Sequence, residues 1–221
     1  MKKIAILIFF IVFISGSAFT QISLGGGLLF DMSFGNGYKW MHNNNFRQEG
    51  INNTTFGGFV FFDYRYIEVD LSFGYGMLTS TYKAEEFGAK SEPDPEKAGS
   101  ILQLSVSAFG KFPIDLGVII VFPLVGLNYN MVLSMSDTNG NNPYEGKDKT
   151  ALKELSQFGF LFGAGLDFPI NEFFFLRAEA MFNLRLANKA NSDAVKFENS
   201  KEYKTTLGMG PRVKLGAGFR L

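Results

Sequence analysis

The sequence has no cysteine, a single histidine and a single tryptophan among its 221 residues. Without cysteine it can form no disulfide, no thiolate metal site, no cysteine nucleophile and no lipidated cysteine anchor. It also lacks an uninterrupted run of 18 apolar residues. The longest candidate, 116–127, is broken by Gly117, Pro123 and Gly126. No transmembrane helix is therefore expected.

The sequence also has no excess of positive or negative charge, since it contains 21 Lys and Arg and 21 Asp and Glu. Residues 1–18 have the form of a secretory signal: Lys2 and Lys3, an apolar core over 4–14, and small residues at 16–18. We expect export through the Sec pathway with cleavage after Ala18, or alternatively after Thr20. Residues 19–221 then form one mature domain with 21 − 2 = 19 bases and 21 acids, a net charge of −2. That balance indicates no nucleic-acid partner.

Glycine (25) and phenylalanine (26) are abundant, and they follow a period of two. In residues 205–221, one face is apolar and the other is small or basic. Because side chains of a strand point alternately to opposite faces, this segment is predicted to be a strand. The apolar face holds Leu207, Met209, Pro211, Val213, Leu215, Ala217, Phe219 and Leu221; the other holds Gly208, Gly210, Arg212, Lys214, Gly216, Gly218 and Arg220.

The same alternation predicts eight strands, at about 21–35, 54–62, 67–77, 102–108, 116–134, 157–168, 174–186 and 205–221. Long polar loops at 36–53, 79–99, 136–153 and 187–203 alternate with short turns near 63–65, 111–115 and 169–171. The facing of 54–62 is left open, because it is aromatic on both sides. A bulge is expected at Pro123, where the alternation changes phase, and a bulge or a lost ladder bond at Pro211.

Alternation alone also fits a soluble sandwich or a lipocalin-like barrel. Three features favour a membrane barrel: glycine and serine fill the less apolar face, as a narrow lumen requires; long and short connections alternate; and aromatic residues gather near strand ends. Two interfacial girdles are expected from Tyr38, Trp40, Tyr64, Tyr66, Tyr82 and Tyr129. The predicted fold is an all-β, eight-stranded antiparallel up-and-down transmembrane β-barrel, closed because hydrocarbon tolerates no open sheet edge.

The spacing of Lys214, Gly216, Phe219 and Leu221 resembles the C-terminal β-signal of bacterial outer-membrane barrels, although Leu221 stands where that family usually ends in Phe or Trp. The whole pattern resembles the small eight-stranded outer-membrane barrels of the OmpA/OmpX type. The resemblance implies a monomer in contact with outer-membrane lipid, inserted by the barrel-assembly machinery through the C-terminal strand.

Charged residues on the less apolar face are predicted to form an ion network in the lumen. They are Glu68, Asp70, Asp167 and Glu179 with Arg177, Arg212, Lys214 and Arg220. An eight-stranded lumen is just wide enough to be filled by side chains, and unpaired charges there would be costly. A self-satisfied plug is therefore favoured over a gated pore. Removal of Glu179 is expected to destabilise the barrel by leaving a base unpaired.

Two patterns that could carry chemistry are weak. His42, Ser80 and Asp94 could form a nucleophile–base–orienter set, as in an outer-membrane lipid-modifying enzyme, but no motif fixes them. Asp137, Asn139, Asn141, Glu145 and Asp148 approximate a calcium loop, but Asn142 stands where that loop needs glycine. We expect no enzyme, no cofactor and no metal site.

The function is instead predicted in the four long loops, as a structural or surface-contact, adhesin-like role toward an extracellular or host ligand. A narrow, porin-like solute channel is the alternative.

Overall fold

The computed structural model describes residues 22–34, 40–42, 46–86, 89–90, 94–136, 139–140, 156–186 and 208–221. Within 40–51, 80–90 and 94–98 only the backbone is described. The predicted signal segment and the loop 187–203 lie outside these ranges, as does most of 136–153. No helix long and apolar enough to cross a membrane occurs among the described residues.

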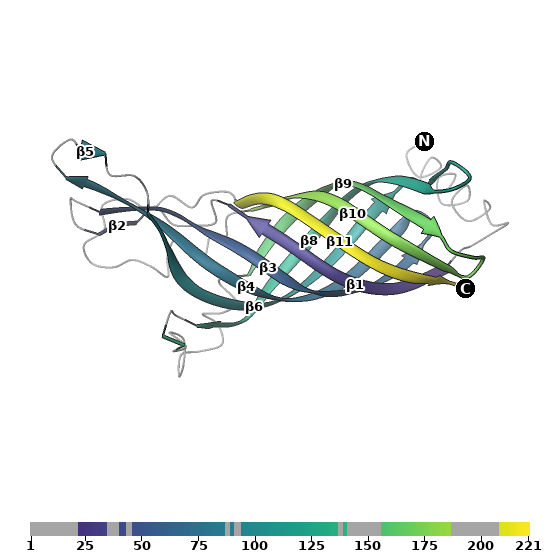
Figure 1. Ribbon diagram of the computed structural model, residues 1–221, viewed down its shortest axis with the longest axis horizontal. Coiled ribbons are helices and arrows are strands. Elements are labelled where there is room, and N and C mark those ends of the chain that lie inside the picture. Colours follow the sequence, from purple (N-terminus) through teal and green to yellow (C-terminus); the bar gives the residue numbers. More distant parts are fainter. Residues whose placement is uncertain are drawn as a thin grey trace, which may run out of the picture.

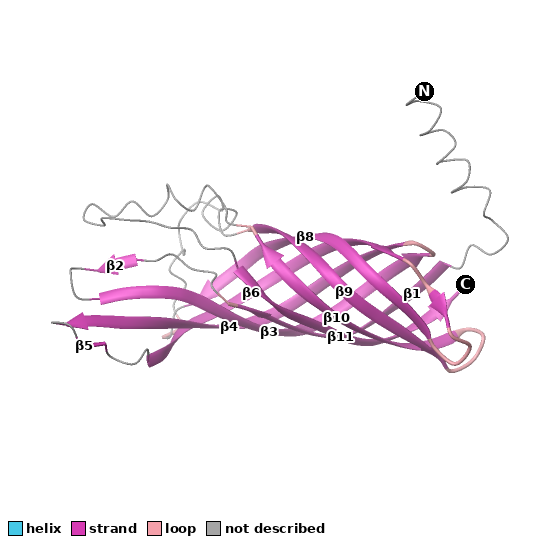
Figure 2. Ribbon diagram, turned by 90° about the horizontal axis from the view of Figure 1, so that it is seen from above, coloured by secondary structure: helices cyan, strands magenta, loops and turns pink. Residues whose placement is uncertain are grey.

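Eight long strands form a closed antiparallel barrel (Figures 1 and 2). Each strand pairs with the next along the chain, and the last pairs back with the first, so the predicted fold is confirmed. They are β1 (Ile22–Ser33), β3 (Phe46–Tyr64), β4 (Ile67–Glu86), β6 (Asp94–Lys111), β8 (Ile120–Ser136), β9 (Gln157–Pro169), β10 (Phe174–Arg185) and β11 (Gly208–Arg220). Three short strands are added to them: β2 (Trp40–His42) on β3, β5 (Ala89–Lys90) on β4, and β7 (Ile114–Asp115) on β8.

The stagger of the barrel can be read from one continuous line of paired residues. Followed around all eight strands, the line that starts at Leu24 on β1 returns at Phe34, the residue directly after β1, ten residues further along. It runs through Leu24, Phe62, Val69, Ala108, Leu127, Phe160, Leu184, Met209 and Phe34. With ordinary strand spacings this stagger gives a tilt of about 41°, inside the usual range for barrels.

The apolar face of every strand points outward, and the charged face points into the lumen. On the outer wall Leu71 is 45% exposed, Phe160 46% and Val60 58%, whereas Arg212 and Lys214 inside are 0% exposed. This arrangement is the inverse of a soluble protein and is that of a transmembrane barrel. It also settles the facing of β3, because Phe59 and Phe61 are buried in the lumen while Phe56, Val60 and Phe62 lie outside.

The first two predicted loops are partly strand, so their bounds were wrong. β3 already begins at Phe46, and β4 and β6 continue through 79–86 and 94–99, paired with each other as far as Tyr82 and Asp94. In Figure 1 these three strands extend well beyond the ends of the others. Where both faces of a strand can meet water, the binary pattern that revealed the wall segments is no longer required.

The expected bulge at Pro123 is also wrong, because β8 passes through Pro123 opposite Ala164 with no register shift. The apparent change of phase comes from Phe122 and Leu124, which are large and apolar yet face the lumen and are 0% and 3% exposed. The irregularity of β8 lies instead on its other ladder, with β6, where the register shifts between Leu102 and Gln103.

The turn predicted at 111–115 is in fact a small hairpin, made by β7 with the start of β8. Its tip lies at Gly117, whose φ of 86° favours glycine. At Pro211 the pairing with β1 stops after Asp31↔Arg212 and resumes at Phe34↔Met209 in the same register. A ladder bond is thus lost without a bulge.

Candidate functional site: the charged lumen

Glycines on the wall make room for large side chains inside the narrow lumen. A Cβ added at Gly218 would lie 2.2 Å from the ring of Phe175, and one at Gly165 would lie 2.3 Å from the ring of Phe122. Such distances are shorter than real contacts, so only glycine lets these rings fill the space. The lumen is therefore filled by side chains from opposite walls, as expected for eight strands.

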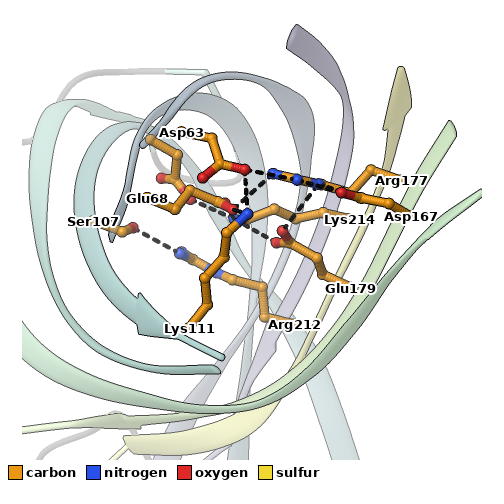
Figure 3. A network of polar contacts seen from close by, with 10 residues as sticks. Asp63, Glu68, Ser107, Lys111, Asp167, Arg177, Glu179, Arg212 and Lys214 are labelled. Carbon is orange, nitrogen blue, oxygen red and sulfur yellow. Dashed lines mark hydrogen bonds and ion pairs between the residues drawn. The ribbon is translucent and has the colours of Figure 1, made fainter. Parts of the chain in front are cut away.

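Arg177 on β10 is the centre of the larger group of charges, which we call the lower cluster because it lies toward the short turns. Its Nε and one terminal nitrogen donate to the two oxygens of Asp167, each at 2.7 Å. The other terminal nitrogen donates to Glu68 Oε2 at 2.7 Å, and Nη2 also reaches Asp63 Oδ2 at 2.9 Å. A guanidinium with its donors fixed by three carboxylates is held in one orientation. Figure 3 shows these side chains converging across the lumen.

Two lysines complete the lower cluster. Lys214 on β11 donates to Glu179 Oε2 at 2.8 Å, contacts Asp70 directly and lies 3.8 Å from Glu68. Lys111 at the end of β6 contacts Asp63 and lies 3.7 Å from Glu68 Oε2. Residues from β3, β4, β6, β9, β10 and β11 are thus tied together across the lumen.

Aromatic rings surround the cations of the lower cluster. The guanidinium carbon of Arg177 lies 4.3 Å from the ring centre of Phe61 and 5.0 Å from that of Phe175. Lys214 Nζ lies 4.7 Å from the ring centre of Phe109. Cations are attracted to ring faces, more strongly where water is excluded. Two groups of buried apolar side chains fill the space around the charges. The first is Phe109, Phe122, Leu124, Leu161 and Met181, and the second is Leu29, Phe59, Phe61 and Phe175.

A second group, the upper cluster, lies toward the loop side. Asp31 Oδ2 on β1 accepts from Arg185 at 2.8 Å and from two nitrogens of Arg212 at 3.0 and 2.7 Å. Another nitrogen of Arg212 reaches Ser107 Oγ at 3.5 Å. Neutral polar side chains line the wall at the same level, among them Asn128, Asn130, Asn183, Gln103 and Thr55, all 5% exposed or less.

The two clusters are opposite in charge. Counted over the residues named, the lower cluster has five acids (Asp63, Glu68, Asp70, Asp167, Glu179) and three bases (Lys111, Arg177, Lys214). The upper has one acid and two bases. The lumen is therefore polarised along its axis, with the negative side toward the turns.

Seven of the eight residues predicted for the lumenal network lie in these clusters; Arg220 does not join them. It is partly exposed near the turn side, with its guanidinium carbon 5.0 Å from the ring centre of Phe175. Four further members were not predicted. Asp31 and Arg185 stand on the less apolar faces of their strands and could have been included by parity, whereas Asp63 and Lys111 were assigned to turns that are in fact strand ends.

The residues of the predicted β-signal are divided between the two faces of β11. Lys214 points into the lumen and is 0% exposed. Gly216 pairs with Gly27 across the β1 ladder, beside the ring of Phe59. Phe219 lies outside with ring centres 5.9 Å from Phe173 and 5.1 Å from Phe174. Leu221 is 68% exposed, and its N–H donates to Ile22 O at 2.8 Å.

The predicted girdle residues are only partly described. Tyr64 is 41% exposed on the turn side, and Tyr66 packs on Phe112 there, with ring centres 5.9 Å apart. Tyr129 packs on Phe158 at 4.5 Å, at the loop-side end of β9. Trp40 and Tyr82 lie in β2 and β4, where only the backbone is described, and Tyr38 lies outside the described residues.

The backbone register separates the three residues of the possible catalytic set. His42 pairs with Phe46, which pairs with Ala84, four residues from Ser80 along β4. Two strand spacings and four residues amount to about 16 Å between His42 and Ser80. Asp94 pairs with Tyr82, also far from His42. In the described part of the chain, no group of three or more His, Cys, Asp or Glu could hold a metal ion. The calcium-like segment lies outside that part except for Asn139.

No family model matches the chain, and no curated protein matches it. Solved structures similar to it include the outer membrane protein OprG from Pseudomonas aeruginosa, with 12% identity, a TM-score of 0.47 and coverage of 91% of this chain and 96% of that one. Ail, the attachment invasion locus protein of Yersinia pestis, has 16% identity and a TM-score of 0.44, and the match covers 91% of this chain and 99% of that one. Outer Membrane Protein W of E. coli has 14% identity and a TM-score of 0.44, and the match covers 91% of this chain and 98% of that one.

The resemblance drawn from the sequence is confirmed by the architecture itself. The closed ladder, the outward apolar face and the inward charges are those of a barrel built to stand in a bilayer. The chain thus has the architecture of a small eight-stranded outer-membrane β-barrel.

Proposed function

We propose that the protein is an integral outer-membrane barrel with a closed lumen, and that its role is structural and surface contact, adhesin-like, at the loop end. The observation that carries this proposal is the burial of the lumenal charges: every charged member of the two clusters is 6% exposed or less, and Glu68, Arg212 and Lys214 are each 0% exposed. Charges that no water can touch do not line an aqueous path. The lumen therefore supports the wall and carries no solute flow.

The loop end offers a surface for contact. The last residue of β1 in the ladder, Ser33, pairs with Asn53, and β3 continues beyond it to Phe46. Seven further residues correspond to about 23 Å along the strand. With the paired ends of β4 and β6 this makes a three-stranded extension (residues 46–52, 79–86 and 94–99) above the wall. A paired platform of this kind suits recognition of an extracellular or host ligand, together with the loops 36–53, 79–99, 136–153 and 187–203.

Catalysis is not part of this proposal, because the register keeps His42 apart from Ser80 and Asp94 by about three strand spacings or more. A narrow channel is the competing function. The purified protein in planar bilayers is expected to give no steady conductance. Regular open levels that scale with salt would overturn the closed lumen and favour the channel.

The contact role is tested by replacing residues 81–95 with a two-residue turn between Ser80 and Glu96, which are directly paired and suit a tight hairpin. Cells carrying this variant are expected to lose attachment to host cells or immobilised extracellular matrix, with normal barrel levels in the outer membrane. Shortening 187–203 tests another of the proposed contact loops in the same way. Unchanged attachment after both changes would contradict the adhesin-like role.

Insertion is proposed to depend on β11, whose Lys214, Gly216, Phe219 and Leu221 would be recognised by the barrel-assembly machinery. Two features support this. β11 supplies a ladder edge to both β1 and β10, and the ring of Phe219 stands on the outer wall where another protein can reach it.

A further inference from the structure

The connection between β6 and β8 differs from the other two short connections described on the same side of the barrel. The β3–β4 turn carries Arg65, and the β9–β10 turn carries Asn171 and Glu172. The β6–β8 connection is a longer hairpin, 112–119, that includes β7. Asp115 is its one charged residue.

This hairpin has a fixed conformation. Ile114 and Asp115 pair with Val121 and Ile120. The tip is closed by a bond from Leu116 N–H to Ile119 O at 2.9 Å. The carboxylate of Asp115 accepts a hydrogen bond from Gly117 N–H at 2.7 Å, so its negative charge is directed toward the backbone of the tip.

The side chains that the hairpin presents are large and apolar. Phe112 is 69% exposed, Ile114 54%, Leu116 61% and Val118 71%. They continue the outward column of β8 formed by Val121, Pro123, Val125 and Leu127, so the hairpin extends the lipid-facing wall without a polar break.

The hairpin lies beyond the level that the hydrocarbon needs. From Val121 to Met131 the outward column of β8 spans ten residues, which at about 3.3 Å per residue and a tilt of about 41° gives about 25 Å along the axis. That already matches the apolar band of an outer-membrane barrel, about 25 Å. Residues 112–119 therefore fall at the level of the headgroups, beside Tyr66, whose ring packs on Phe112.

We propose that this hairpin is an interfacial anchor, with Leu116 and Val118 inserted among the headgroups and upper acyl chains of the periplasmic leaflet. Lipid is the chosen occupant because the surface is continuous with the lipid-facing wall. An apolar patch at this depth gains free energy by entering the interface. The inference rests on the proposed membrane location, and it adds that the barrel is held more firmly on the β6–β8 side.

The test uses tryptophan as a depth reporter. Trp40, the chain's single tryptophan, is replaced by Trp40→Phe, and Val118→Trp, Glu172→Trp or Leu127→Trp is added to that background. Each full-length protein is refolded into two kinds of phosphatidylcholine vesicle, one with acyl chains brominated near the headgroup and one with acyl chains brominated deep in the chain. Native-like folding is checked by heat-modifiable migration on gels.

Val118→Trp is expected to show blue-shifted emission and several-fold stronger quenching by the brominated lipid than Glu172→Trp, together with protection from aqueous iodide. Leu127→Trp, in the middle of the wall, reports the membrane assignment itself and should be quenched best by lipids brominated deep in the chain.

If Leu127→Trp is quenched but Val118→Trp behaves like Glu172→Trp, the anchor is refuted while the membrane location stands. If Leu127→Trp is not quenched, the membrane location fails as well. Protection of Val118→Trp that disappears when the protein is diluted in lipid would assign the tip to a second copy of the chain and overturn the lipid proposal.

Discussion

At the scale of single residues, Asp31 has the least replaceable charge in the described lumen. It is buried, and it accepts from both Arg185 and Arg212. Two guanidinium groups would lose their carboxylate partner at once in Asp31→Asn. A buried charge left without its partner typically costs about 3–5 kcal/mol.

Asp31→Asn is therefore expected to lower the free energy of unfolding by about 3–5 kcal/mol, measured by urea titration of protein in lipid vesicles. Arg185→Met is the matched control, since it leaves Asp31 and Arg212 as a one-to-one pair and should cost much less. Equal effects of the two changes would show that the charge count of the upper cluster does not govern its stability.

Lys214 and Glu179 are partners, yet they are not equivalent. Without Glu179, Lys214 keeps its contact with Asp70, so the sequence-based expectation of an unpaired base is wrong. Without Lys214, both Asp70 and Glu179 lose their ammonium group. Lys214→Met is expected to cost about 3–5 kcal/mol, and Glu179→Gln about 1–3 kcal/mol. The same urea titrations check the order, and a larger loss for Glu179→Gln would contradict the acid excess of the lower cluster.

The inward charges on clear strands could be predicted from a period of two, and Glu68, Arg177 and Lys214 were. The sequence could not reveal which carboxylate meets which base, because that depends on the ten-residue stagger. Phe122 and Leu124 misled the pattern for a physical reason: an apolar side chain can fill a packed lumen as well as it faces lipid.

At the scale of strands, Pro211 interrupts the ladder that closes the barrel. Met209 and Phe34 exchange both of their backbone hydrogen bonds, so the next such pair on this ladder is Pro211 with Met32. Proline has no N–H to give, and Met32 O therefore lacks its ladder donor at that point. In hydrocarbon no water can replace that bond.

Pro211→Val is expected to stabilise the barrel by about 1 kcal/mol, since it restores one backbone hydrogen bond of the ladder between β1 and β11. A rise in the urea midpoint with an unchanged slope would support this account. Slower exchange of the new Val amide proton, compared with other amides at the loop-side rim, would be direct evidence. A fall in stability would show that the packing of the Pro211 ring contributes more to stability than the backbone hydrogen bond that the ring prevents.

Strand ends were the least predictable elements. The ends of β3 and β6 that carry Asp63 and Lys111 looked like turns because charged residues appear there, although each points into the lumen and contacts the other. The continuation of β3, β4 and β6 past the wall was missed because polar residues on both faces leave no alternation to detect.

At the scale of the whole molecule, the closed ladder and the three-stranded extension are structurally separate. All eight strands are paired at the level of Leu24, Phe62 and Val69. Above Ser33, among the residues that the structure describes, β3, β4 and β6 continue with β2 and β5. The wall therefore does not need the extension in order to close.

Replacing residues 81–95 by a two-residue turn is accordingly expected to leave the barrel intact. Its heat-modifiability midpoint should match that of the unaltered chain. Its free energy of unfolding, from urea titration, should change by less than about 0.5 kcal/mol, as for surface changes away from the core. A variant that no longer migrates as a folded species would show that the extension nucleates or braces the wall.

β11 contributes Arg212 to one group of lumenal charges and Lys214 to the other, and it forms a ladder on each of its edges. Until that strand arrives, a nascent chain holds a surplus of carboxylates along an unsealed sheet, a state that bilayer hydrocarbon strongly disfavours. A chain that lacks the closing segment is therefore expected not to insert stably, because its carboxylates and its open sheet edges would face the bilayer without partners.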